Sequence, residues 1–85
     1  MRYSQPARAA RNHYIAERED ANSAARLYMR FEEVTTLVGR FPYLGREGRL
    51  RGTRELMVSG TPYVFIYRVE RSVVTILDIQ HSGRR

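Results

Sequence analysis

The spacing of apolar residues changes period near the middle of the chain, and this change most constrains the fold. From Leu27 to Val38 apolar residues recur at intervals of three and four, which places them on one face of an α-helix. Beyond Arg54 the apolar residues form short β-branched and aromatic runs separated by turn residues. A helical first half followed by consecutive strands predicts an α+β domain, with helices packed on one face of a sheet.

Two helices are expected in the first half. The first runs from about Pro6 to Arg18, because proline is tolerated in a first helical turn and Ser4 precedes it as a cap. The second begins after a cap at Asp20 or Asn22 and contains the apolar stripe.

The end of the second helix and the segment after it are rich in glycine. We expect Gly39 to end the helix in a left-handed conformation and Pro42 to prevent its continuation. Between residues 41 and 53, glycines alternate with arginines, a composition that disfavours both helix and strand. This segment is predicted to be a basic loop.

Three strands are expected in the second half, over the runs RELMV, YVFIYRV and VVTILDI. The turns fall at residues 59–62 and 70–72, so the strands form a small antiparallel meander. Tyr63, Phe65 and Tyr67 alternate along the middle strand, and we assign them to the core rather than to base stacking. At 85 residues, the chain is predicted to form one domain, residues 1–85.

The charge balance indicates acidic partners. The chain has 15 basic and 9 acidic residues, a net charge of +6, and every basic residue is arginine. The planar guanidinium suits phosphate and carboxylate, but a GC-rich genome would also favour arginine over lysine. The net charge, rather than the choice of arginine, is therefore the evidence for acidic partners. With no cysteine and no apolar run of roughly 18 to 20 residues, we predict a cytoplasmic protein with no metal, cofactor or membrane span.

Four ordered motifs stand in the second half: Phe41-Pro42 with Gly45-Arg46, Gly52 with Arg54-Glu55, Tyr63-Val64 with Tyr67-Arg68-Val69, and His81 with Arg84 and Arg85. In this order they resemble the RelE/ParE family, the toxins of bacterial type II toxin–antitoxin systems, and an ordered set is more specific than any single motif. The resemblance implies a cognate antitoxin, a small acidic protein with a DNA-binding N-terminus, that wraps the toxin and blocks it. Because only three residues precede Ser4, the family's first strand is expected to be short or absent.

The resemblance leaves two targets open. RelE-like members resemble ribosome-dependent mRNA endonucleases, and ParE-like members inhibit DNA gyrase. RNA cleavage would need proton-transfer groups and cations near the phosphate, for which the candidates are His81, Arg54 and Arg68. The favoured interpretation of His81 is a strand-end residue that packs and hydrogen-bonds. Glu55 could serve as a base, but a charged residue at a strand start is usually solvated or paired with a neighbour such as Arg54.

A concave basic surface is the expected binding site for the target or the antitoxin. It is predicted to contain Arg49, Arg51, Arg54, Arg68, Arg71, Arg84 and Arg85, and the alternative is a scatter of solvated arginines. Val64 occupies the place where RelE-like enzymes generally carry arginine, and no tyrosine follows Tyr67. Both departures favour gyrase inhibition over mRNA cleavage. A third possibility is an inactive relative that only binds antitoxin.

Overall fold

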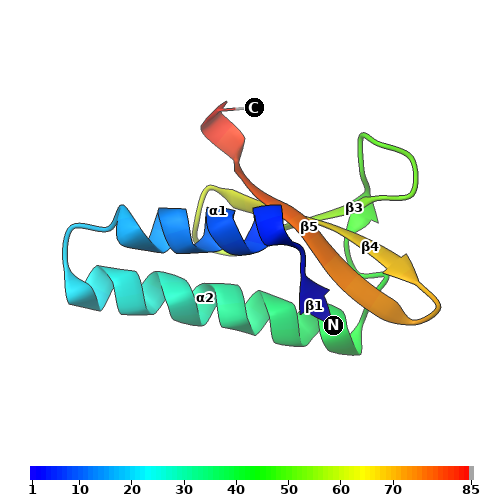
Figure 1. Cartoon of the computed structure of the whole chain (residues 1–85), viewed down its shortest axis with the longest axis horizontal. Coiled ribbons are helices and arrows are strands. Elements are labelled where there is room, and N and C mark those ends of the chain that lie inside the picture. The colour runs from blue at the N-terminus through cyan, green and yellow to red at the C-terminus, as the bar shows by residue number, and fades with distance from the viewer. Residues whose placement is uncertain (85) are drawn as a thin grey trace.

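Two helices form an antiparallel hairpin along one side of the molecule (Figure 1). The computed structural model describes residues 1–84, in which α1 spans Gln5–Ala16 and α2 spans Ala21–Arg40. Ser4 caps α1 by accepting the Ala7 N–H at 3.1 Å, and Asp20 caps α2 by accepting the Ser23 N–H at 2.7 Å. The predicted helices and the cap at Ser4 are confirmed, although α1 ends two residues before Arg18.

The prediction that Gly39 ends α2 is wrong. Gly39 lies inside the helix, and among residues 1–84 the glycines with positive φ are Gly52 and Gly60. The helix ends after Arg40, where Phe41 donates its N–H to the Leu37 carbonyl at 2.8 Å. Because Pro42 disfavours a helical conformation in the residue before it, proline rather than glycine terminates α2.

Five strands form one sheet in the order β1-β5-β4-β3-β2. The expected meander is present as three antiparallel strands, and a two-residue strand is added at each edge. The first of these, β1, runs parallel to β5, so the sheet is mixed rather than purely antiparallel. The strands are β1 (Arg2–Tyr3), β2 (Arg46–Glu47), β3 (Arg54–Met57), β4 (Tyr63–Glu70) and β5 (Val73–His81), followed by the 3₁₀ turn η1 (Ser82–Arg84).

Both edge strands depend on a few backbone contacts that a composition-based prediction misses. Beside β1, Ser4 donates its N–H to the Ile76 carbonyl at 2.9 Å and its hydroxyl to the Leu77 carbonyl at 2.9 Å. Next to β2, the Gly48 N–H bonds the Thr53 carbonyl at 2.8 Å and closes the loop. The segment 41–53 was expected to be a loop throughout, but it contains the short strand β2.

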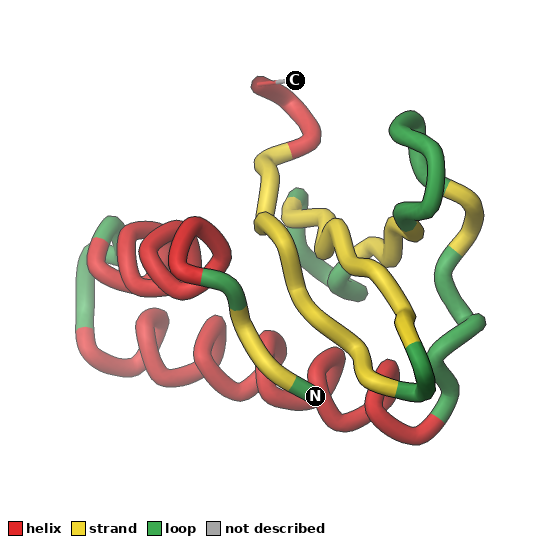
Figure 2. Tube along the Cα trace, turned by 45° about the vertical axis from the view of Figure 1, so that its right-hand side comes forward, coloured by secondary structure: helices red, strands yellow, loops and turns green. Residues whose placement is uncertain are grey.

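The core lies between the helices and one face of the sheet (Figure 2). The Phe31 ring of α2 contacts both Tyr63 and Phe65 of β4, each at 5.6 Å between ring centroids. Tyr67 and Phe65 are completely buried, which confirms the prediction that the β4 aromatics are core residues. No helix within residues 1–84 is long and apolar enough to cross a membrane.

The register of β4 and β5 shifts in the middle of the hairpin. Ile66 pairs with Asp78 and Tyr67 with Ile76, which leaves Leu77 as the extra residue of a β-bulge. Beyond the bulge, β5 continues past the two residues that pair with β1. Its last four residues therefore lie uncovered by β1 and form one wall of a concavity.

Candidate functional site

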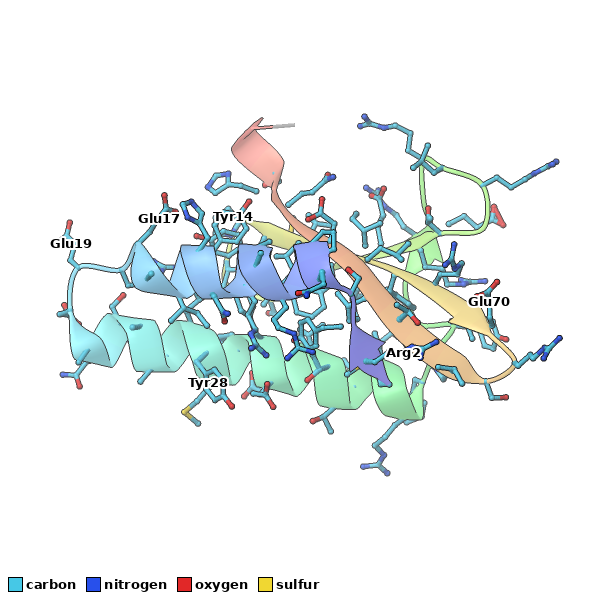
Figure 3. All side chains as sticks on the ribbon, viewed as in Figure 1. Arg2, Tyr14, Glu17, Glu19, Tyr28 and Glu70 are labelled. Atoms are coloured by element: carbon cyan, nitrogen blue, oxygen red, sulfur yellow. The ribbon has the colours of Figure 1, made fainter. Side chains whose placement is uncertain are left out.

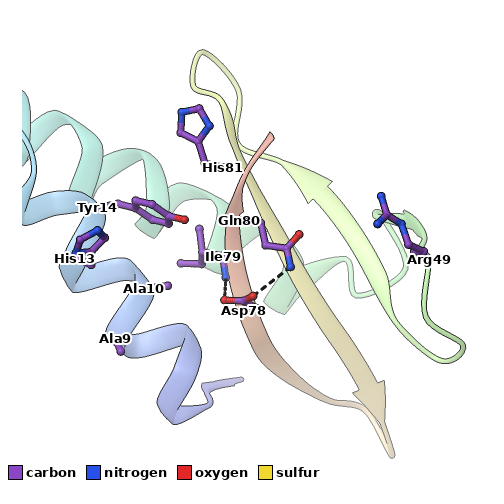
Figure 4. A pocket seen from close by; sticks show the side chains of 9 residues that line it. All are labelled: Ala9, Ala10, His13, Tyr14, Arg49, Asp78, Ile79, Gln80 and His81. Carbon is purple, nitrogen blue, oxygen red and sulfur yellow. Dashed lines mark hydrogen bonds between the residues drawn. The ribbon is translucent and has the colours of Figure 1, made fainter. Parts of the chain in front are cut away.

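A concavity of about 600 Å³ lies between α1 and the end of β5 (Figure 4). Helix α1 contributes His13 and Tyr14, and β5 contributes Asp78 to His81. Arg49, from the loop between β2 and β3, completes the lining on the other side of the hairpin. The Asp78 carboxylate accepts hydrogen bonds from the Ile79 N–H and the Gln80 side-chain amide, so it stiffens the strand end.

Four rings form a continuous series along the edge of this concavity. The centroid distances are 5.6 Å from His13 to Tyr14, 4.5 Å from Tyr14 to Tyr63, and 5.4 Å from Tyr63 to His81. His13 is exposed, and its Nε2 lies 3.2 Å from a Glu17 carboxylate oxygen. No pattern in the sequence predicts that both histidines border one hollow.

His81 ends β5, as the sequence predicted. Its Nδ1 accepts the Gly83 N–H at 3.1 Å, so in the neutral ring the proton resides on Nε2. An imidazole in this tautomer can donate a proton from Nε2, but its edge-to-face packing on Tyr63 also fits the strand-end packing role. Both interpretations of His81 remain compatible with its contacts.

A second group of motif residues forms a network around the segment that follows α2. The Tyr67 hydroxyl donates to the Pro42 carbonyl at 2.8 Å and accepts the Gly45 N–H at 2.8 Å. Arg54 donates from Nη1 to the Gly45 carbonyl at 2.7 Å, and its guanidinium lies 4.9 Å from the Tyr43 ring centroid. These bonds fix the position of residues 42–45 against the sheet.

Gly45 is required in this network by space rather than by backbone conformation. A Cβ at this position would lie 2.6 Å from the Tyr67 hydroxyl oxygen and 2.8 Å from the Glu55 carbonyl oxygen. Both distances are shorter than van der Waals contact. Only glycine allows the segment to approach β3 and β4 this closely.

Glu55 holds the other side of the same loop. Its side chain is buried, with one carboxylate oxygen 3.4 Å from Arg46 Nη2 and the other accepting the Arg49 N–H at 3.3 Å. The expected pairing of Glu55 with Arg54 is wrong. Side chains alternate along β3, so Arg54 points to the opposite face of the sheet. Glu55 is thus engaged in fixing the loop.

Three arginines of the predicted basic surface gather around this loop. Arg49, Arg51 and Arg54 line a hollow of about 570 Å³ together with Tyr43 and Val69. Its rim also carries exposed apolar side chains, since Leu50 is 70% exposed and Tyr43 is 67% exposed. We name this surface, formed by Tyr43, Arg49, Leu50, Arg51 and Arg54, the loop surface.

Comparison with known proteins identifies the family. The family model for the ParE toxin of the type II toxin–antitoxin system parDE matches residues 2–85. The chain belongs to the ParE toxin family. The candidate toxin Y4kP of Sinorhizobium fredii is 36% identical over 69 residues, which cover 81% of this chain and 71% of that protein. A structure of a chromosomal ParDE TA system from P. aeruginosa shares the fold, with a TM-score of 0.76 at 20% identity over 94% of this chain and 91% of that one.

The ParE-family toxin does not collect all its predicted arginines into one concave surface. Arg68 follows Tyr67 and so faces away from Arg54, and its Nε lies 3.4 Å from a Glu70 carboxylate oxygen. Arg71 sits in the β4–β5 turn with φ of 50° and borders a separate hollow with Arg2 and Glu70. Figure 3 labels Arg2 and Glu70 among the side chains at this end of the molecule. The single surface expected from the sequence is therefore divided. The side chain of Arg84 and all of Arg85 lie outside the described residues.

In this toxin the family motifs are joined by contacts that sequence reasoning missed. Tyr67 had been assigned to the core alone, and Arg46 had no role, yet both hold the loop. The signal was available in the motif set itself, because Pro42, Gly45 and Tyr67 all belong to it. Motif residues far apart in sequence that share no apolar pattern are candidates for direct contact.

Proposed function

We propose that this toxin arrests growth by binding DNA gyrase through the loop surface. The observation that carries the proposal is the composition and rigidity of that surface. Exposed Leu50 and Tyr43 stand beside Arg49 and Arg51 on a loop whose base is fixed by Glu55. Aromatic and arginine side chains on a fixed support are typical of the residues that dominate protein–protein interfaces.

The contacts of the predicted catalytic residues also favour binding over phosphate chemistry. The Arg54 guanidinium donates to the Gly45 and Tyr43 carbonyls, and the Tyr67 hydroxyl bonds the loop backbone. A group that stabilises a developing phosphorane must have donors directed at substrate. Val64, on the face opposite the helices, adds no charge to the sheet.

The decisive experiment is a parallel pair of assays on the purified toxin. We expect inhibition of gyrase supercoiling with no cleavage of ribosome-bound mRNA. The double variant Leu50→Ala, Arg51→Ala should lose inhibition by at least tenfold, because truncated interface anchors commonly cost more than about 1.4 kcal/mol each. The matched control is Met29→Ala, which removes a 62%-exposed apolar side chain from α2 and should leave inhibition unchanged. Unaltered supercoiling at saturating toxin contradicts the proposal.

A ribosome-dependent endonuclease is the second candidate, and one observation favours it. His81 and Arg49 line the same concavity, which therefore contains both a proton-transfer group and a cation. If the chain is an endonuclease, His81→Ala abolishes mRNA cleavage and toxicity while antitoxin binding persists. Full toxicity of His81→Ala excludes it.

We also propose that a cognate antitoxin neutralises the chain, as the family description and the ParDE complex of P. aeruginosa suggest. A net charge of +6 would attract an acidic segment that folds on binding. A neighbouring reading frame that encodes a small acidic protein supports the pairing. Harmless overexpression without that protein would instead mark the chain as an inactive relative.

A further inference from the structure

Three arginines outside the predicted basic surface converge beside the β3–β4 turn. Arg18 comes from the connection between the helices, and Arg26 and Arg30 come from the first half of α2. Together they line a hollow of about 270 Å³. We name these three residues the α2 arginine site, whose remaining lining is Ser23, Leu27, Gly60 and Thr61.

Two of the three charges repel each other. Arg26 and Arg30 are four residues apart, so they neighbour each other on one helix face, where like charges destabilise a helix by about 0.2–0.5 kcal/mol. Glu33 offsets one of them, with its carboxylate oxygen 3.4 Å from Arg30 Nη1. The other terminal nitrogen of Arg30 is directed at the turn, since a Cβ at Gly60 would lie 3.9 Å from it. An anion in the hollow would relieve the repulsion that remains.

Arg18 contributes a buried donor that lacks an acceptor. Its Nε is buried and makes no hydrogen bond within the described part of the chain, while its guanidinium carbon lies 5.9 Å from the Tyr63 ring centroid. An unpaired buried donor costs on the order of 1–3 kcal/mol, and an acceptor oxygen of a bound anion would remove that cost. The Tyr63 ring keeps this cation at the edge of the hollow rather than in bulk solvent.

We propose that the α2 arginine site binds a phosphate of a nucleic-acid backbone. Planar guanidinium groups grip phosphate oxygens bidentately, and three of them around one hollow match an anion rather than an apolar ligand. Leu27 is only 3% exposed, so the hollow provides charge but almost no apolar surface to anchor the side chains of an acidic peptide. A phosphate backbone needs no such anchor.

The site is separate from the loop surface. The connection between the helices lies at one end of the molecule, and the loop between β2 and β3 lies at the other (Figure 1). Binding of nucleic acid at the α2 arginine site therefore leaves the loop surface available for a protein target. It would give the toxin a second attachment point on a target that itself holds DNA or RNA.

The test is the salt dependence of nucleic-acid binding by the full chain. Fluorescence anisotropy is measured with a 20-base-pair DNA duplex and a 20-nucleotide RNA at several salt concentrations, for wild type, Arg26→Gln and Arg8→Gln. Arg8 is exposed on α1 and lies outside the hollow. Arg8→Gln therefore removes the same charge as Arg26→Gln without altering the site. We expect Arg26→Gln to lower the slope of log affinity against log salt by about 0.9 for duplex or about 0.7 for single strand. Arg8→Gln should leave that slope unchanged, and the probe that shows the difference identifies the nucleic acid.

Two results would overturn the proposal. Equal slope changes in both variants mean that net charge, not a site, drives binding. An Arg26→Gln variant that loses binding to a poly-glutamate peptide but keeps its nucleic-acid slope means that the site takes acidic peptide. Circular dichroism melting checks the fold, and Arg30→Gln provides an independent reading if Arg26→Gln is unstable.

Discussion

Two tyrosine hydroxyls in this molecule show how differently its two sides are built. The Tyr67 hydroxyl makes two hydrogen bonds to the loop after α2, each 2.8 Å long. The Tyr3 hydroxyl is also buried, but no hydrogen bond of comparable geometry reaches it among the described residues, and the polar side chains that influence it include those of Arg11 and Thr35. On the loop side Tyr67 is held by short, well-directed bonds, whereas on the α1 side the buried Tyr3 hydroxyl and Arg18 Nε have no such bond in the portion of the chain that the structure describes.

This difference separates a positioned region from a packed one. Around the loop, directional bonds from Tyr67, Arg54 and Glu55 determine where residues 42–49 lie. Beneath α1, ring contacts such as Tyr14 on Tyr63, at 4.5 Å between centroids, fill the space between the helix and the sheet. Substitutions should therefore cost more on the loop side than on the α1 side, and we order the expected effects accordingly.

The largest effect is expected from Gly45→Ala. The added Cβ would lie 2.6 Å from the Tyr67 hydroxyl oxygen and 2.8 Å from a backbone carbonyl, so the loop must move. We expect a loss of about 3 kcal/mol, at the upper end of overpacking costs, measured by urea unfolding. Gly39→Ala is the control with the opposite sign, because a Cβ there would meet no atom within 4 Å apart from the chain neighbours and the backbone of α2 itself. It should gain roughly 0.5–1 kcal/mol from helix propensity.

Tyr67→Phe should have the next largest effect. It leaves the Gly45 N–H and the Pro42 carbonyl without their partner, which costs about 1–3 kcal/mol for a buried group. The same change at Tyr28, which is 47% exposed, should be neutral in urea unfolding. Equal stability of the Tyr67→Phe and Tyr28→Phe proteins would show that the loop is held by packing alone.

Arg54→Lys tests whether the guanidinium positions the loop through its fork. Lysine keeps the charge but loses the paired contacts to the Gly45 and Tyr43 carbonyls and the stacking on the Tyr43 ring. We expect a loss of about 1 kcal/mol in unfolding free energy, with a parallel loss of gyrase inhibition. Arg51→Lys in the same loop should leave stability unchanged. If the two variants behave alike, charge rather than geometry is what Arg54 contributes.

The parts of the fold that depend on local sequence patterns could be predicted, and the parts that depend on contacts between distant residues could not. The second helix and the three-stranded meander were predictable because hydrophobic period reports local structure. The edge strands were less predictable, because each pairs over only two residues: the resemblance left β1 as short or absent, and β2 was not predicted at all. Gly39 was misjudged because proline at position 42 already restricts Phe41, so no left-handed residue is needed.

The candidate site was less predictable than the fold. Residue types could be read along the strands, but the face that each occupies depends on register. Arg54 pairs opposite Tyr67 and therefore faces away from Arg68, which divides the surface that composition suggested. The concavity bordered by His13 and His81 requires knowledge of how α1 packs beside β5, and no local pattern contains it.

On the α1 side, His81→Gln is expected to have little effect on stability. The ring packs on Tyr63 and accepts the Gly83 N–H, contacts at a chain end that glutamine partly replaces. We expect a change below about 0.5 kcal/mol and unchanged gyrase inhibition. A stable variant that loses toxicity would transfer the functional centre from the loop surface to the concavity.

The smallest effect near neutral pH is expected from Tyr3→Phe, which repeats the Tyr67→Phe change where the hydroxyl makes no well-directed hydrogen bond within residues 1–84. The ring contact with Phe65, at 6.4 Å between centroids, is retained, so unfolding free energy should change by less than about 0.5 kcal/mol.

Burial raises the pKa of Tyr3 above its ordinary value of 10.0, and Glu32 adds to the rise while Arg11 opposes it. The folded state therefore holds this proton more tightly than the unfolded state, and stability present below pH 10 is lost as the pH rises through the raised pKa. Urea unfolding at about pH 8 and about pH 11 should show wild type losing more stability than Tyr3→Phe at the higher pH. Identical losses would mean that the hydroxyl is solvated, and the contrast between the two tyrosines would disappear.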